Sequence, residues 1–170
     1  MPHMQDYSNL TPKITTLLPK KVIGKRHKMT FANNRTFELF RSFMPERKAI
    51  NNPVTNDIFC IQLYKDFHGF DDLQPNMEFE KWAAIEVSDF SNIPDGMEAY
   101  TIEGGLYAVF HYVGSSTDIR IFEYIFKTWL PGSGYELDER EHFEILGEKY
   151  KNNDLASEEE IWVPVKLKLS

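Results

Sequence analysis

The sequence predicts an α+β fold made of two similar halves, each with the element order β-α-β-β. In each half, segments of alternating apolar and polar residues flank one stretch with helical spacing, and this order occurs in residues 13–90 and again in 98–170. The 170 residues are enough for one domain. Such a duplication predicts pseudo-twofold symmetry, an antiparallel sheet with two helices and a central cleft between the halves. We expect residues 1–12 to form an N-terminal tail.

The first half is predicted to contain a strand bent by a proline, a helix and two further strands. Pro19 should interrupt the extended pattern of the first strand. Phe37, Phe40 and Met44 share one helical face. The expected ranges are about 14–29 for the bent strand, 33–46 for the helix, and 58–64 and 79–87 for the later strands.

The second half repeats this order with different residues. Gly104-Gly105 predicts a bulge in the extended segment, and Pro131 with the glycines after it predicts the end of the helix. The apolar residues with helical spacing are Ile119, Phe122, Phe126 and Trp129. The expected ranges are about 100–112, 116–130, 142–146 and 160–169.

Composition argues against several classes of function. The net charge of −7, from 26 acidic and 19 basic residues, does not suit duplex nucleic acid, so we expect no direct nucleic acid binding. A run of about 18 apolar residues is absent, which predicts no membrane span. The single cysteine, Cys60, cannot form an internal disulfide, and the polar start lacks a signal core. Together these features favour the cytoplasm.

Cofactor and metal motifs are equally sparse. The sequence has no phosphate-binding loop, no dinucleotide fingerprint and no Gly-x-Ser-x-Gly elbow. The histidines do not follow a ligand spacing, and a continuous run such as Glu158-Glu159-Glu160 alternates between strand faces. We therefore expect neither a cofactor nor a metal.

Four motifs in the second half resemble those of one known family. They are Gly104-Gly105-Leu106-Tyr107-Ala108-Val109-Phe110, Trp129-Leu130-Pro131-Gly132-Ser133-Gly134-Tyr135, His142-Phe143-Glu144, and Glu160-Ile161-Trp162-Val163-Pro164-Val165-Lys166. Their identity and order resemble the GyrI-like small-molecule-binding domains, which are also called bacterial transcription activator effector-binding domains. The resemblance covers about residues 13–168.

The resemblance implies two β-α-β-β halves around a pseudo-twofold axis and a small-molecule ligand. In many members the domain follows a helix-turn-helix region and reports drug or metabolite binding. This sequence leaves no residues for such a region, so a standalone sensor or sequestering protein is expected. In members that bind cationic drugs, acidic residues of the last two strands line the pocket, which implies Glu144 and Glu160 here.

Aromatic residues complete the candidate site. A carboxylate beside ring faces suits an amphipathic or cationic molecule. Tyr64 and Trp82 lie on adjacent predicted strands, and each brings a ring with a polar tip. Phe122 and Phe126 form a helical stripe that either packs in the core or lines the cleft. The remaining candidates are Leu146, which shares a strand face with Glu144, and Trp162, which shares one with Glu160.

Two other functions remain open from the sequence. Some standalone members of the family look like hydrolases of small electrophilic molecules that use a pocket glutamate and a tyrosine. Glu160 with Tyr64 or Tyr107 would be that pair, with the carboxyl as general acid or base. The family also includes a gyrase inhibitor, so a protein partner is a third possibility.

Overall fold

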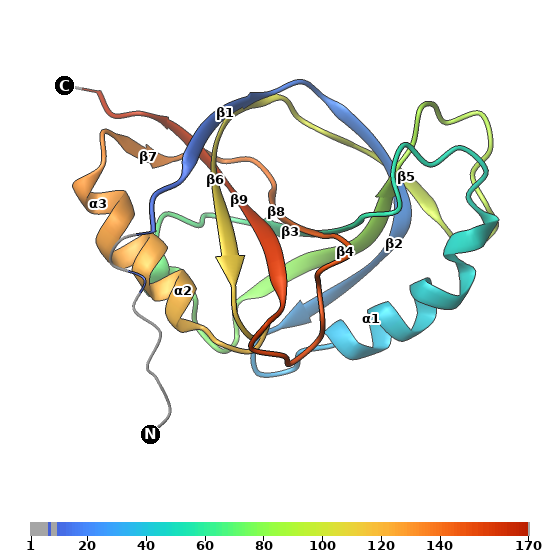
Figure 1. The fold of residues 1–170 in the computed structure, drawn as a ribbon, viewed down its shortest axis with the longest axis horizontal. Coiled ribbons are helices and arrows are strands. Elements are labelled where there is room, and N and C mark those ends of the chain that lie inside the picture. Colours follow the sequence, from blue (N-terminus) through green and yellow to red (C-terminus); the bar gives the residue numbers. More distant parts are fainter. Residues whose placement is uncertain (1–6, 8–9, 170) are drawn as a thin grey trace.

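The structure, a computed structural model, describes residue 7 and residues 10–169 (Figure 1). The first half contains β1 (Lys13–Leu17), β2 (Lys20–Thr30), α1 (Thr36–Phe43), the 3₁₀ helix η1 (Met44–Ala49), β3 (Ile58–Tyr64), the 3₁₀ helix η2 (Phe70–Asp72) and β4 (Glu78–Glu86). The second contains β5 (Glu98–Ile102), β6 (Gly105–Val113), α2 (Arg120–Glu123), the π-helical segment η3 (Tyr124–Trp129), α3 (Leu130–Gly132), β7 (Tyr135–Leu137), β8 (His142–Leu146) and β9 (Glu158–Leu167). The fold is α+β, as predicted.

The strand order shows the internal duplication. All neighbouring strands are antiparallel, and their order is β1-β6-β9-β8-β3-β4-β2-β5, with β7 beside β9. If β1, β2, β3 and β4 correspond to β5, β6, β8 and β9, the order reads the same from both ends. The axis passes between β3 and β8, and each half gives its first strand to the other half's sheet edge.

This exchange corrects two expectations about the strands. The bent strand of each half is two separate strands, β1 with β2 and β5 with β6. Pro19 cannot donate a ladder hydrogen bond, so the first break falls at Leu18-Pro19. The second falls at Glu103-Gly104, directly before Gly105 with its φ of +143°. After each break the chain pairs with a different neighbour.

Both helical segments pack against the same face of the sheet. Leu39 and Phe43 of α1 pack with Ile23, Ala83 and Ile85 of the first half. On the other side, Ile121 of α2 and Ile125 of η3 pack with Phe110, Ile161 and Val163 of the second half. Figure 1 shows the two helical segments well apart, with the segment of α2 and α3 at the left and α1 at the lower right.

The helices are shorter or start later than predicted. The first is α-helical over Thr36–Phe43 and tightens into η1 at Met44-Pro45. The second runs continuously from Arg120 to Gly132. It starts later than predicted because residues 115–118 form a turn, in which Asp118 accepts a hydrogen bond from the Arg120 N–H at 3.0 Å. Its centre, η3, is a π-helix, a form often found as a bulge within α-helices. None of the described helices has the length and apolar character of a membrane-spanning helix.

The opposite face of the sheet carries a second core. Trp82, Tyr107 and Phe143 are at most 3% exposed there, together with Val22 and Ile102. The Tyr107 hydroxyl donates to the Glu141 carbonyl at 2.9 Å. The central strands are therefore buried on both faces.

The predicted tail lies mostly outside the described residues. Within it, Tyr7 is buried: its hydroxyl donates to Asp118 Oδ2 at 3.0 Å, and its ring packs against Tyr112. This part of the N-terminal segment therefore belongs to the core beside α2.

Candidate functional site

A cavity of about 380 Å³ lies on the helix-covered face of the sheet, beside α2 and η3. Pockets for small organic ligands usually have volumes of this order. Its floor comes from β3, β4, β8 and β9, and α2 and η3 form one wall. The aromatic residues along it are Phe31, Tyr64, Phe67, Phe79, Tyr112, Phe122, Phe126, His142, Phe143 and Trp162.

Two carboxylates of adjacent strands line this cavity, Glu144 of β8 and Glu159 of β9. Glu144 is opposite Ile161, and Glu159 lies two residues before Ile161, so both side chains are on the same sheet face. Glu159 is 7% exposed, and its Oε2 atom has no hydrogen-bond partner among the described residues. The cavity therefore holds two acidic groups for which the described part of the chain provides no ion pair.

Burial governs the protonation of both carboxyls. It raises the pKa of Glu144, and the positive charge of Lys81 opposes that rise. Burial, with a further contribution from the charge of Glu144, raises the pKa of Glu159 to about 8. Because the charge of Glu144 acts on Glu159, the two carboxyls titrate as a pair. At neutral pH the pair holds at least part of a proton.

Three other polar groups line the cavity near these carboxyls. Lys81 donates to Thr36 Oγ1 of α1 at 2.9 Å. His142 is 8% exposed, and burial followed by the charge of Arg140 lowers its pKa to about 3, so its ring is neutral. Burial raises the pKa of Tyr64 well above its usual range. The tyrosine ring stacks on Phe67 with centroids 4.9 Å apart.

Five of the predicted site residues border the cavity. They are Tyr64, Phe122, Phe126, Glu144 and Trp162. The Trp162 ring itself stacks on Phe143 with centroids 5.1 Å apart, in contact with the core of the opposite face. Strand alternation therefore leaves mainly the Trp162 backbone toward the cavity.

Glu160 lies outside the cavity, contrary to the sequence-based expectation. Its side chain is exposed on the other face, where Oε1 accepts a hydrogen bond from the Trp162 indole at 3.1 Å. The alternation of β9 was assigned correctly, but the inward face is that of Glu159, Ile161 and Val163. The signal that could have identified the site is Glu159 itself, a glutamate on the otherwise apolar face of β9.

Three further candidates also lie elsewhere. Trp82 is opposite Ile61 in the strand register, so it packs in the opposite core, and its indole donates to Glu80 at 2.8 Å. Tyr107 belongs to the same core. Leu146 is on the cavity's side of the sheet, but it is covered by the core beneath α1. The sequence did not fix the strand registers that decide these positions.

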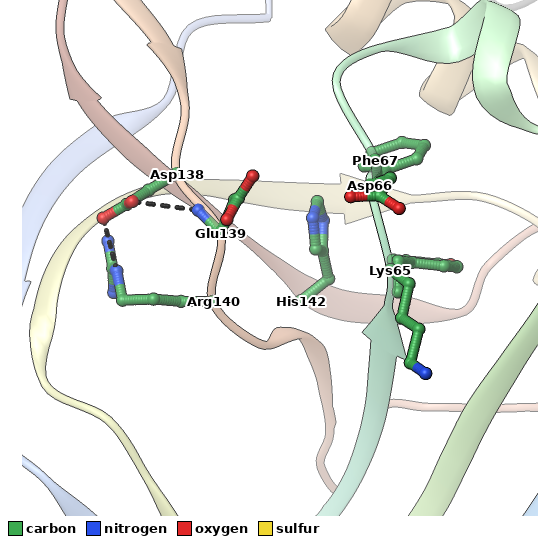
Figure 2. Close-up of a pocket in the computed structure, with 8 residues that line it drawn as sticks. Lys65, Asp66, Phe67, Asp138, Glu139, Arg140 and His142 are labelled. Atoms are coloured by element: carbon green, nitrogen blue, oxygen red, sulfur yellow. Dashed lines mark hydrogen bonds and ion pairs between the residues drawn. The ribbon is translucent and has the colours of Figure 1, made fainter.

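A second hollow of about 320 Å³ adjoins the first (Figure 2). The two share Tyr64, Phe67 and His142. Figure 2 shows Arg140 beside Asp138, away from the His142 ring. Arg140 Nε donates to Asp138 at 2.8 Å, and its guanidinium lies 4.6 Å from the Tyr107 ring centroid. Asp138 thus pairs with the Arg140 charge, although Arg140 Nη1 has no hydrogen-bond partner among the described residues. The ion pairs found among the described residues include neither Glu144 nor Glu159 of the larger cavity.

The fold and the cavity are those expected of a small-molecule-binding domain, and the sequence matches one such family along most of its length. The family model of the GyrI-like small molecule binding domain matches residues 10–166. The chain belongs to this family.

Individual relatives agree with this assignment. The transcriptional regulator BrlR of Pseudomonas aeruginosa is 24% identical over 162 residues, which are 92% of this chain and 56% of BrlR. The chain thus spans little more than half the length of this relative. The C-terminal domain of EcmrR has a similar fold, with a TM-score of 0.69 and 19% identity over 94% of this chain and 99% of that domain. The structure of SAV2435 bound to tetraphenylphosphonium has a TM-score of 0.60 and 16% identity over 91% of this chain and 93% of that protein.

Proposed function

We propose that this small-molecule-binding domain takes a hydrophobic organic cation into the larger cavity. Glu144 and Glu159 would face the positive charge, while Tyr64, Phe122 and Phe126 would contact the apolar groups. The observation that carries the proposal is an aromatic cavity with two glutamates and a single lysine among its described lining residues, in which Glu159 Oε2 has no hydrogen-bond partner. The tetraphenylphosphonium complex of SAV2435 supports the same ligand class.

The chemistry favours a cation whose charge is shielded by apolar groups. Such an ion has a small desolvation cost, so entering a partly dry cavity loses little hydration energy. A carboxylate pair offsets the charge, and the faces of aromatic rings add an attraction of about 0.5–2 kcal/mol each. A small, strongly hydrated cation would pay more for desolvation and contact fewer rings.

The mouth of the cavity suits an amphipathic molecule as well. Ile119 is 62% exposed and Phe31 is 37% exposed, and both line the cavity. Apolar groups of the ligand can therefore remain in contact with the protein at the entrance while the charge lies deeper. We propose a sensing or sequestering role, and the similarity to the transcriptional regulator BrlR supports the sensing role.

Calorimetry with two ions of the same shape tests the proposal. Tetraphenylphosphonium and tetraphenylborate differ chiefly in the sign of their charge. The cation should bind with measurable heat, and the anion should bind at least about 10-fold more weakly, since only the cation is attracted by a carboxylate of the pair. Equal binding of both ions, or binding of neither, would reject the proposed ligand class.

A small-molecule hydrolase is the second candidate, and one observation favours it. Glu159 carries a raised pKa and lies opposite Tyr112 of β6 in the strand register. A carboxyl that holds a proton near neutral pH can act as a general acid. Release of a hydrolysis product from a small electrophile, abolished in Glu159→Gln, would favour this enzyme over the binding domain.

A further inference from the structure

The charges along the cavity do not balance if both glutamates are ionised. Glu144 and Glu159 would contribute two negative charges, and Lys81 is the one lysine or arginine among the described residues that line the cavity. Asp118 also lines it, but Arg120 binds that carboxylate at 2.6 Å. An empty cavity with both glutamates ionised would therefore carry one uncompensated negative charge.

Buried carboxyls avoid such a charge by keeping a proton. Glu159 is 7% exposed and its Oε2 has no partner among the described residues, so water and protein do little to stabilise its anion. Glu144 on the adjacent strand adds repulsion. Lys81 favours the ionised form of Glu144. One proton held by the pair, together with the positive charge of Lys81, brings the empty cavity close to neutral.

The other titratable groups around Glu159 do not supply the missing charge. Tyr112 on β6 and Tyr150 have raised pKa values, chiefly through burial, so both hydroxyls stay neutral. Burial raises the pKa of the Cys60 thiol of β3 to about 12, so it is neutral too. The two rings shared with the second hollow, Tyr64 and His142, are uncharged near neutral pH.

We infer that the cavity exchanges one proton for one monovalent cation, which displaces the proton held between Glu144 and Glu159. The O–H bond of one carboxyl breaks, the proton passes to the buffer, and the resulting carboxylate faces the ligand's charge. Both glutamates, Lys81 and the cation then sum to zero. This inference rests on the proposed function and narrows its ligand to molecules with a single positive charge, because a second charge would again be unbalanced.

Calorimetry with tetraphenylphosphonium in two buffers tests the exchange. At about pH 7 the observed enthalpy is measured in phosphate and in HEPES, whose protonation enthalpies differ, and the difference gives the number of protons released. The wild type should release about half to one proton per cation, and Glu159→Gln should release close to none. Glu160→Gln is the matched control, since it removes an exposed carboxylate one residue away and should release as many protons as the wild type.

The outcomes separate this inference from the function on which it rests. Binding of tetraphenylphosphonium by the wild type with the same enthalpy in both buffers would overturn the exchange and leave the ligand class standing. No binding at any pH from about 6 to 9 would overturn both. If Glu159→Gln does not fold, the wild type alone tests the exchange. Its affinity for tetraphenylphosphonium should rise with pH, by up to about tenfold per pH unit while the pair holds its proton. An affinity that does not change with pH would reject the exchange.

Discussion

Glu144 and Glu159 face one cavity from adjacent antiparallel strands, and burial raises the pKa of each. Leaving a carboxyl in such a place costs stability, because the folded protein hinders its ionisation. Proteins commonly keep groups of this kind at sites that bind or react. The relationship between these two residues therefore underlies most of the predictions below.

The first prediction concerns stability against pH. The Glu159 carboxyl has its pKa raised from 4.5 to about 8, so the folded state binds its proton more tightly than the unfolded chain. The stability that this protonated carboxyl contributes is complete below its pKa in the unfolded chain. It is lost as the pH rises toward 8, the pKa in the folded protein. Glu159→Gln should therefore gain at least about 1.4 kcal/mol over the wild type between pH 5 and 9, the equivalent of one pKa unit.

Urea unfolding at several pH values measures this difference. Glu160→Gln serves as the control, because its carboxylate is exposed and should follow the wild type. If the free energy of unfolding changes with pH in the same way for the wild type and for Glu159→Gln, the Glu159 carboxyl does not have a raised pKa in the folded protein.

The second prediction concerns the aromatic wall. Phe122 of α2 is partly buried and lines the cavity, so Phe122→Leu should keep the apolar contact while losing the ring face. Affinity for tetraphenylphosphonium should fall by about 0.5–2 kcal/mol, the range of a cation–π contact. Phe37→Leu is the control, since Phe37 is 76% exposed on α1 and does not line the cavity. Equal losses in the two variants would rule out a specific role for the Phe122 ring.

The third prediction concerns the paired glycines of the second half. Gly105 has a φ of +143°, and a Cβ there would lie 2.7 Å from Nη1 of Arg140. Gly105→Ala should lower the free energy of unfolding by about 2 kcal/mol or more, through backbone strain and displacement of a buried guanidinium. Gly134→Ala should be nearly neutral, because no atom lies within 4 Å of its Cβ position. Thermal unfolding of the two variants tests this difference in stability. A Gly105→Ala protein as stable as Gly134→Ala would contradict the prediction.

The sequence allowed much of the fold to be predicted, because its signals are local. Alternation and helical spacing located the central strands and both helices, and four motifs identified the family. The strand exchange was missed, since the breaks at Pro19 and Gly104 were interpreted as a bend and a bulge. Which neighbour a strand pairs with after a break depends on the whole sheet, and a local pattern does not contain that information.

The candidate site was predicted less completely, for a related reason. Alternation divides β9 into two faces, but it does not say which face meets the helices. The sequence analysis assigned the face of Glu160 and Trp162 to the cavity. It therefore named Glu160 as the acidic site residue, one position away from Glu159, which lines the cavity. Trp82 was misplaced in the same way, because its register opposite Ile61 puts it on the face away from Tyr64. Glu144 and the helical phenylalanines were found because their positions follow from motif and helix periodicity.

The most direct measurement is the affinity for tetraphenylphosphonium of Glu159→Gln and Glu160→Gln, compared with the wild type at about pH 8. These variants make the same chemical change at adjacent residues on opposite faces of β9. Loss of a charge-assisted contact in a partly dry cavity should weaken binding by about 1.5–3 kcal/mol in Glu159→Gln, and Glu160→Gln should stay within about twofold of the wild type. Equal effects of the two changes, or a larger effect of Glu160→Gln, would contradict the assignment of the cavity as the cation site.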